Sequence, residues 1–471
     1  MSCSDLLFIK EVRNLKSVFR LNDFYLKNNV LAGSHDPSMM YDENTKKYYS
    51  YSTDINGEII GIKDKIGIPI RSSENLVDFK YEGIALSEKS IKQAQDNGKY
   101  EKTINFWAPF VEYINDEYRL YYSATRAFGS SESKIWLAVS DNPLGPFENR
   151  GVVIDTWGTD NTYPNGIDPH IIWSENKCFL VYGSFFGGIY LKELNPKNGM
   201  PLDNNPKNLG KCIARKAKNP RIDGPEGASI IYVKQTGYYY LFLSYGWLGE
   251  NYDIRVGRSK TVDGDYLDIN NKNLIEESMG LKIANSYCFK AENPAIGNDN
   301  PNWKWSGFMA NGHGVPFFDP VRNQYFFVHH VRDGAEIYKK QDENRAYYTN
   351  HYMMIRPMFF INGWPVLSPE PFADENFKEI CLEKTLKDCF NSTIHKWEFI
   401  FLDDQNNDKK HSVVKTINLN NKLLKQGKIH LCWDFENQKQ TFIITGINQF
   451  GVAYWGKLLY NSIIDFSKIL L

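Results

Sequence analysis

The stretch "DPHIIWSENKCFLVYGSF", residues 168–185, decides the fold. It predicts a strand from Ile171 to Trp173, a polar turn from Ser174 to Lys177, and a second strand from Cys178 to Tyr182. A carboxylate and a proline, Asp168 and Pro169, stand directly before the first strand. The unit is therefore a β-hairpin with an unusual residue at its mouth.

Four other segments repeat this unit, each with a special residue, an apolar strand, a polar turn and an aromatic strand. They are "HDPSMMYDENTKKYYSYST" from His35, "APFVEYINDEYRLYYSAT" from Ala108, "EGASIIYVKQTGYYYLFLSYG" from Glu226 and "GHGVPFFDPVRNQYFFVHHV" from Gly312. The residues at the mouths, called anchors below, are Asp36, Ala108, Asp168, Glu226 and His313. Such self-similarity is typical of repeat architectures.

A weaker hairpin pattern follows three of the units, in "RSSENLVDF" at 71, "AVSDNPLGPF" at 138 and "GRSKTVDGDY" at 257. Two hairpins together make one four-stranded blade. We therefore predict an all-β protein whose residues 1–370 form a five-bladed β-propeller, because radial closure leaves only short, protected sheet edges. The one amphipathic stretch, 87–102, predicts a helix inserted between blades.

The pattern changes after "GWPVLSPEPFADENF" at 363–377. Short alternating strands such as "HKWEFIFLDD", "KIHLCWDF", "QTFIITGI" and "VAYWGKLL" follow, with Asn- and Lys-rich turns. They predict a second domain, residues 371–471, built as a small β-barrel or sandwich. No low-complexity linker separates the two parts, so we expect them to pack together.

Composition bounds the partners and the compartment. The formal net charge is −1 and no basic stripe is present, which argues against nucleic acid. No apolar run reaches the roughly 18 residues of a membrane span. The seven cysteines have no CxxC spacing, and their odd number favours reduced thiols in the cytoplasm; removal of a signal peptide would instead imply a secreted or cell-surface protein. A monomer with a neutral partner is expected.

Three of the five anchors are carboxylates: Asp36, Asp168 and Glu226. An Asp before a Pro is a common turn initiator, but acids at one register in three of five repeats favour a site at one end of the channel. Glycoside hydrolysis needs two carboxyls that flank the scissile bond. Glu226 lies among apolar and small residues in "DGPEGASII", which raises its pKa and suits a general acid, with Asp168 as the neighbour that tunes its proton.

These residues resemble glycoside hydrolase family 43. The resemblance rests on "HDPSMMYDENTKKYYSYST", "NFWAPFVEY", "GIDPHIIW", "PEGASIIY" and "GHGVPFFDP", and covers roughly residues 25 to 370. Within the family, "GSFFGGI" and "SYGW…YDIRVGRS" are similar to the endo-1,5-α-L-arabinanases, and the tail with "VAYWGKL" is similar to the extra β-domain of the longer members. One departure is that Gly227-Ala228 follows the acid where many arabinanases have Ala-Pro.

The resemblance implies cleavage of α-1,5-L-arabinofuranosidic bonds in arabinan or arabino-oligosaccharides, with inversion of configuration. Asp36 would be the general base, Glu226 the general acid and Asp168 the residue that modulates the pKa of the acid. The resemblance also implies one calcium ion in the channel, held largely through water, with His313 as its protein ligand. Asn165 and Ser184 correspond to residues that contact substrate.

Two further predictions come from the residues themselves. Trp107, directly before the second anchor, is expected to stack on a sugar ring, with core packing as the alternative. His329 and His330 lie on one strand, where neighbouring side chains point to opposite faces, so at most one faces the channel; core packing is the expected role.

Three alternatives to the arabinanase stay open. An exo-acting α-L-arabinofuranosidase or a β-xylosidase of the same family would release monomers only. A fructan-cleaving propeller would carry WMNDPNG-like, RDP and EC motifs, which this sequence lacks. A non-catalytic carbohydrate-binding propeller would bind glycan without turnover, and the three intact acids argue against it.

Overall fold

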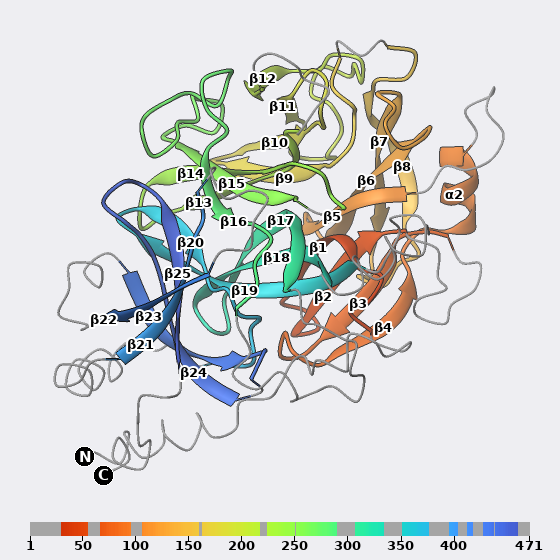
Figure 1. Ribbon diagram of the computed structural model, residues 1–471. Coiled ribbons are helices and arrows are strands. Elements are labelled where there is room, and N and C mark those ends of the chain that lie inside the picture. Colours follow the sequence, from red (N-terminus) through yellow and green to blue (C-terminus); the bar gives the residue numbers. More distant parts are fainter. Residues whose placement is uncertain are drawn as a thin grey trace, which may run out of the picture.

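The computed structural model describes residues 30–54, 66–95, 106–159, 163–216, 224–249, 251–289, 307–333, 351–375, 395–403, 412–417, 427–437 and 439–459. These residues form β-sheet apart from one helix, α2 (Glu88–Gln95), which confirms the all-β prediction (Figure 1). The Ser87 hydroxyl caps α2 by accepting the N–H of Ser90 at 3.1 Å. The helix predicted over 87–102 is confirmed as far as Gln95, and its remainder lies outside the described residues. No helix in the described part has the length and apolar character to span a bilayer.

Five four-stranded antiparallel sheets follow one another along the chain, with their strands in sequence order. The first is β1 (His35–Asp42), β2 (Lys47–Thr53), β3 (Pro69–Ser73) and β4 (Phe79–Ile84). The second is β5 (Phe106–Ile114), β6 (Glu117–Thr125), β7 (Ser133–Ser140) and β8 (Glu148–Asp155). The third is β9 (His170–Ser174), β10 (Lys177–Tyr182), β11 (Ile189–Leu194) and β12 (Lys211–Ala214).

The fourth sheet is β13 (Glu226–Val233), β14 (Tyr238–Tyr245), β15 (Asp253–Ser259) and β16 (Leu281–Ala284). The fifth is β17 (Phe308–Asp319), β18 (Gln324–Asp333), β19 (His351–Ile361) and β20 (Trp364–Leu367). Each sheet therefore consists of two successive hairpins, as the two sequence patterns predict. The turn between β5 and β6 shows how the sequence sets them: Asn115 and Asp116 have φ values of 51° and 60°, which a two-residue type I′ turn requires.

The five sheets form a closed ring. The first strands contact one another in the cyclic order β1, β5, β9, β13, β17 and back to β1 (Figure 1). At the hairpin-turn end, a side-chain hydrogen bond joins each sheet to the one before it. These bonds are Tyr118–Asp42 (2.9 Å), Trp173–Glu112 (2.7 Å), Tyr239–Ser174 (2.8 Å), Tyr325–Gln235 (3.1 Å) and Tyr48–Asp319 (2.7 Å). The last bond ties the first sheet to the fifth, so the ring is closed in the same way at every joint.

The hydrophobic core lies between neighbouring sheets. Tyr51 and Leu120 belong to the cluster between the first and second sheets, and Leu180 to the cluster between the second and third. A third cluster, which includes Leu241, joins the third and fourth sheets. Burying one such Leu contributes about 1.5–3 kcal/mol, so the packing between sheets holds the inner strands, and the residues at their ends, in fixed positions.

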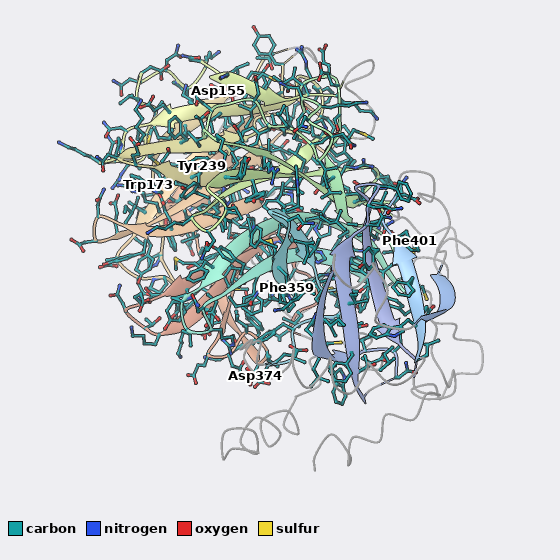
Figure 2. All side chains as sticks on the ribbon, turned by 90° about the vertical axis from the view of Figure 1, so that its left-hand side faces the viewer. Asp155, Trp173, Tyr239, Phe359, Asp374 and Phe401 are labelled. Carbon is teal, nitrogen blue, oxygen red and sulfur yellow. The ribbon has the colours of Figure 1, made fainter. Side chains whose placement is uncertain are left out.

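A five-stranded antiparallel sheet packs beside the ring. It has the order β22 (Ser412–Ile417), β21 (His395–Phe401), β25 (Ala453–Leu458), β24 (Lys439–Ile447), β23 (Gly427–Asp434). Figure 2 shows it, with Phe401 labelled, on one side of the molecule. Trp455 Nε1 and Thr445 Oγ1 each donate to the Leu367 carbonyl at 2.8 Å, which confirms that the two parts pack together. The described residues form one sheet here, and a barrel or sandwich stays a prediction.

A buried ion cluster also joins the two parts. The Lys457 ammonium lies 2.6 Å from Glu370 and 2.9 Å from Asp434, and it contacts Glu436 as well. All four side chains are almost completely buried. Since Glu370 follows β20 and the other three belong to the five-stranded sheet, the lysine holds the two parts together.

Candidate active site

In four sheets the first strand, or the segment directly before it, contains a strained anchor residue. The φ values of Asp36, Ala108, Asp168 and His313 are 47°, 43°, 63° and 46°, in the left-handed region that non-glycine residues rarely occupy. The N–H of each anchor donates to a side chain at the end of the second strand of the preceding sheet. The pairs are Ala108–Thr53 (2.8 Å), Asp168–Ser123 (3.1 Å), His313–Ser244 (2.9 Å) and Asp36–His330 (3.2 Å). These bonds hold the anchors at one end of the ring, where strain of this kind marks functional sites.

The prediction that Glu226 shares the register of Asp36 and Asp168 is wrong. Glu226 pairs with Ser244, as His35 pairs with Thr53 and Trp107 with Ser123. The anchor register of the fourth sheet is therefore occupied by Gly227, whose φ is 58°. Glu226 lies one residue earlier, beside the ring of anchors rather than in it.

The third sheet differs from the others at the residue that should accept the N–H of the next anchor. At the position that supplies Thr53 or Ser123 in other sheets, it has Gly183, where a Cβ would lie 2.4 Å from the Gly188 carbonyl oxygen. No hydroxyl is present there to accept the N–H of Gly227. Asp168 takes its place, because its Oδ2 accepts that N–H at 3.0 Å. Asp168 is thereby fixed to the residue that follows Glu226.

Asp36 is 7% exposed and surrounded by donors. Thr53 Oγ1 donates to its Oδ2 at 2.6 Å, and three histidines contact its carboxylate: His35 at 2.7 Å, His313 at 3.1 Å and His330 at 3.4 Å. Burial raises the pKa of Asp36, but the charges and hydrogen bonds of these histidines outweigh burial and hold the pKa well below its ordinary value. Asp36 is therefore ionised at neutral pH, as a general base must be.

Glu226 has the opposite environment. Burial raises its pKa to about 7, and the negative charge of Asp36 adds to the rise. Ser184 Oγ lies 2.8 Å from Oε2, and the hydroxyl of the buried Tyr252 also bonds this carboxyl. These hydrogen bonds favour the charged form and limit the rise. Glu226 can therefore hold a proton close to neutral pH and release it.

Burial also raises the pKa of Asp168 to about 7, with a contribution from the charges of Glu226 and Asp36. The hydrogen-bond partners decide which carboxyl holds the proton. The N–H of Gly227 can only donate, so Asp168 Oδ2 must accept. The hydroxyls beside Glu226 can also turn and accept from a protonated carboxyl. We therefore place the proton on Glu226 and the charge on Asp168.

The three predicted substrate-contacting residues lie at the same end of the ring. Trp107 is half-buried and occupies the register of Glu226. Ser184 donates to Glu226, a role that the sequence did not indicate. Asn165 is buried, its Oδ1 accepts from Ser133 at 2.6 Å, and its N–H donates to the Ser184 carbonyl at 3.2 Å. Substrate contact by these residues stays a prediction.

Comparison with known proteins shows the family. The model of the family "Glycosyl hydrolases family 43" matches residues 26–365. The chain belongs to glycosyl hydrolase family 43. An extracellular endo-α-(1→5)-L-arabinanase of Thermotoga petrophila is 27% identical to this family 43 chain. The alignment covers 90% of this chain and 93% of the relative. Extracellular endo-α-(1→5)-L-arabinanase 2 of Bacillus subtilis is 30% identical over 61% of this chain and 62% of its own length.

Solved structures of family 43 proteins share the fold. A crystal structure of the endo-1,5-α-L-arabinanase of Thermotoga petrophila superposes with a TM-score of 0.71 at 22% identity, over 91% of this chain and 99% of the other. An exo-1,5-α-L-arabinanase from a bovine ruminal metagenomic library gives 0.52 at 26% identity, over 72% and 98%. The larger overlap with the first includes residues beyond the ring.

The residues around His313 suit an ion with few protein ligands. His313 Nδ1 contacts Asp36 at 3.1 Å, so Nε2 is the ring nitrogen left for an ion, and the ring also interacts with the charge of Asp168. The three-carboxylate cluster of the described residues lies elsewhere and is filled by the Lys457 ammonium. A calcium ion prefers six to eight oxygen ligands. Water would have to supply nearly all of them at His313.

A cluster of three histidines, His35, His330 and His351, does not suit calcium either. Their donor atoms lie within 4.8 Å of one another, but they are nitrogens, which calcium does not favour. The rings of His35 and His330 stack with an interplanar angle of 12° and centroids 4.5 Å apart, so they pack face to face. This cluster serves Asp36, through His35 and His330.

Sequence reasoning missed several residues of the site. The prediction that His329 and His330 face opposite ways is confirmed: His330 contacts Asp36, whereas His329 accepts a hydrogen bond from Arg356 at 2.8 Å. The role expected for the pair, core packing, omitted the contact of His330 with Asp36. Tyr252 was missed because it lies on a loop, outside the repeated hairpins.

Proposed function

We propose that this family 43 enzyme is an inverting endo-1,5-α-L-arabinanase, with Asp36 as general base, Glu226 as general acid and Asp168 as the residue that controls the proton of the acid. The opposite environments of two carboxyls in one site carry the proposal. The pKa of Asp36 lies well below its ordinary value and that of Glu226 well above, at about 7. Such a pair supplies a base and an acid at the same pH.

The chemistry follows from these protonation states. Asp36 removes a proton from the water that attacks the anomeric carbon, while Glu226 gives its proton to the departing glycosidic oxygen. Asp168 keeps its charge through the N–H of Gly227, and that charge holds the proton on Glu226 until the bond breaks. A single displacement inverts the configuration. The names of the relatives, which describe endo-arabinanases, support arabinan as the substrate.

The architecture belongs to the same proposal. We place residues 1–370 in a five-bladed propeller and residues 371–471 in a β-domain of barrel or sandwich type, supported by the closed ring and by the separate five-stranded sheet. The protein acts as a monomer on a neutral glycan. Two relatives are named as extracellular enzymes, so the cytoplasmic location expected from the cysteines stays a prediction.

A calcium ion is proposed at His313 with a shell composed mainly of water. Its charge would favour the ionised forms of nearby carboxyls. His313 would hold it through Nε2, and water would supply the other ligands. No proton transfer in the mechanism depends on it.

The leaving group tests the roles of the two carboxyls. Glu226→Ala should lower the rate on linear arabinan by on the order of 10²–10⁴, and far less on an activated aryl arabino-oligosaccharide, because a good leaving group needs no proton. Asp36→Ala should reduce both rates equally, because the base activates water whatever departs. If Asp36→Ala shows the leaving-group dependence and Glu226→Ala does not, the assignment is wrong.

Glu112→Gln is the matched control. Burial raises the pKa of Glu112 too, but this carboxyl bonds Trp173 at the hairpin-turn end of the ring. It should show no leaving-group dependence. Product sizing then separates endo from exo action, since early oligomers indicate endo cleavage and monomers alone indicate the exo-arabinofuranosidase or β-xylosidase alternative.

A further inference from the structure

Three aromatic side chains form a row at the anchor end of the ring. Trp107 lies in β5, Phe128 in the loop between β6 and β7, and Trp247 in the loop between β14 and β15. The ring centroids of Trp107 and Phe128 are 6.4 Å apart, and those of Phe128 and Trp247 are 6.0 Å apart. Phe128 is 57% exposed and Trp247 44%. The row thus reaches from the second sheet to the fourth, past the third sheet that carries Asp168.

One end of the row adjoins the base. Trp107 precedes Ala108, whose N–H donates to Thr53 Oγ1 at 2.8 Å, and Thr53 in turn donates to Asp36 at 2.6 Å. The backbone that carries the Trp107 indole is therefore connected to Asp36 through two hydrogen bonds.

The other end adjoins the acid. The segment that begins with Trp247 ends with Tyr252, whose hydroxyl bonds Glu226. Trp247 and Tyr252 thus belong to one short loop, with the first side chain exposed and the second 2% exposed. The row therefore connects the surroundings of both reacting carboxyls.

Trp247 is held in place although it is exposed. The backbone N–H of Trp247 donates to Asn251 Oδ1 at 2.7 Å, and the backbone carbonyl of Trp247 accepts the backbone N–H of Asn251 at 3.2 Å. The indole packs on Gly249, where a Cβ would lie 2.2 Å from the indole nitrogen, and Arg332 donates to the Gly249 carbonyl at 3.0 Å. An exposed aromatic ring fixed in advance loses little entropy when a ligand covers it.

The chemistry of the row selects the ligand. The charged residues of the Phe128 loop, Arg126 and Glu132, pair with each other, so they leave no net charge for an acidic glycan. Successive rings are inclined by 60° and 79°, which makes the surface stepped rather than flat. A 1,5-linked furanosyl chain, with a flexible exocyclic carbon in every linkage, can follow such steps. A flat β-1,4-linked pyranosyl ribbon cannot contact all three rings.

We propose that Trp107, Phe128 and Trp247 bind the arabinan chain beyond the cleaved bond, and that Trp247 determines the preference for long chains over short ones. This inference rests on the proposed arabinanase function, and it adds the residues that select chain length and linkage. It predicts that affinity grows with chain length only as far as the chain reaches Trp247.

Binding to enzyme that cannot turn over tests the inference. In a Glu226→Gln background, calorimetry should show that Trp247→Ala weakens binding of linear arabinohexaose by about tenfold and binding of arabinobiose by less than about twofold. Trp247→Phe should retain most of the affinity. Phe450→Ala, which removes a 76% exposed ring from the turn between β24 and β25, should change neither. Equal losses for the two oligosaccharides would overturn the inference.

The active enzyme separates failure of the inference from failure of the proposed function. If the wild type does not hydrolyse linear arabinan, the proposed function is wrong. If it does, and Trp247→Ala lowers kcat/KM for the hexaose and the biose by the same factor, the inference alone is wrong. Xylohexaose should bind at least about tenfold more weakly than arabinohexaose; equal affinity would contradict the argument from the stepped surface. Melting temperatures within a few degrees of wild type confirm that the variants are folded.

Discussion

Ser184→Ala should move the basic limb of the pH–rate profile to higher pH. Ser184 Oγ donates to Glu226 Oε2 at 2.8 Å and stabilises the ionised carboxylate. Removal of this donor raises the pKa of Glu226 above its present value of about 7, so that the acid keeps its proton to higher pH. The variant should therefore lose less activity than wild type between neutral and mildly alkaline pH.

The size of the shift follows from the bond. A hydrogen bond to a charged group contributes about 1.5–3 kcal/mol. Glu226 is partly exposed and retains the Tyr252 bond, so the lower end of this range applies. Since 1.36 kcal/mol corresponds to one pKa unit, the midpoint of the basic limb should rise by about one pH unit. Tyr252→Phe should act in the same direction.

The assay is kcat/KM on linear arabinan across the pH range, because this quantity reports the pKa values of the free enzyme. Thr53→Val is the reciprocal control. It removes the hydroxyl that donates to Asp36 at 2.6 Å, so it should move the acidic limb upward and leave the basic limb in place. A basic limb that stays fixed or moves down in Ser184→Ala would refute the assignment of Glu226 as the acid.

Three further perturbations test the surroundings of the site. Gly227→Ala should lower the free energy of unfolding in urea by about 1–3 kcal/mol, because φ is 58° and the new Cβ would lie 3.0 Å from the His313 Cα; unchanged stability would contradict the placement of Gly227 at the anchor register. Lys457→Met should lower the free energy of unfolding by about 3–5 kcal/mol at pH 7, and by less at pH 5. The reason is that Glu370 and Glu436 have raised pKa values in the folded state, so their protonation at low pH removes the unpaired negative charge. A loss of stability that grows towards low pH would contradict this reasoning. Chelation should lower the melting temperature or the activity reversibly if calcium binds at His313, and an unaffected enzyme would exclude that ion.

The fold could be predicted from the sequence because each hairpin carries its own signals. The apolar strand, the polar turn and the aromatic strand of Ile171 to Tyr182 are local features, and their repetition predicted five sheets of two hairpins. Closure of the ring was expected because it protects the sheet edges, but the residues that make the closing contacts could not be predicted. It depends on tyrosines such as Tyr48 and Tyr118, whose hydroxyls reach acids far away in the sequence, and nothing local marks such partners.

The sequence predicted which residues belong to the candidate site better than it predicted how they are arranged. Asp36, Asp168 and Glu226 lie at one end of the ring, as expected, but two of the three histidines that lower the pKa of Asp36, His313 and His330, come from the distant fifth sheet. His35 is the sequence neighbour of Asp36, but only packing brings the rings of His330 and His351 against the ring of His35. The repeat pattern also placed Glu226 at the wrong register, because the hairpins were aligned by their acids; the same irregularity separates His35 from Ser38 and Glu226 from Ser229, so Glu226 is equivalent to His35.

That one-residue offset gives the three carboxyls different chemistry. Asp36 and Asp168 both lie on strained anchors. Asp36 accepts from Thr53 of its own sheet and contacts His313 and His330 of the fifth, and Asp168 accepts the N–H of Gly227 in the fourth; these partners favour the charged form of each carboxyl. Glu226 precedes its anchor and is bonded only by hydroxyls, which can serve either protonation state. A glutamate at the anchor register in place of Gly227 would still offer its backbone N–H to Asp168, but it would have to adopt a φ near 58° with its Cβ 3.0 Å from the His313 Cα. The glycine after the acid, which departs from the Ala-Pro of many arabinanases, therefore fits the strained anchor position while Glu226 stands one residue earlier, beside hydroxyls.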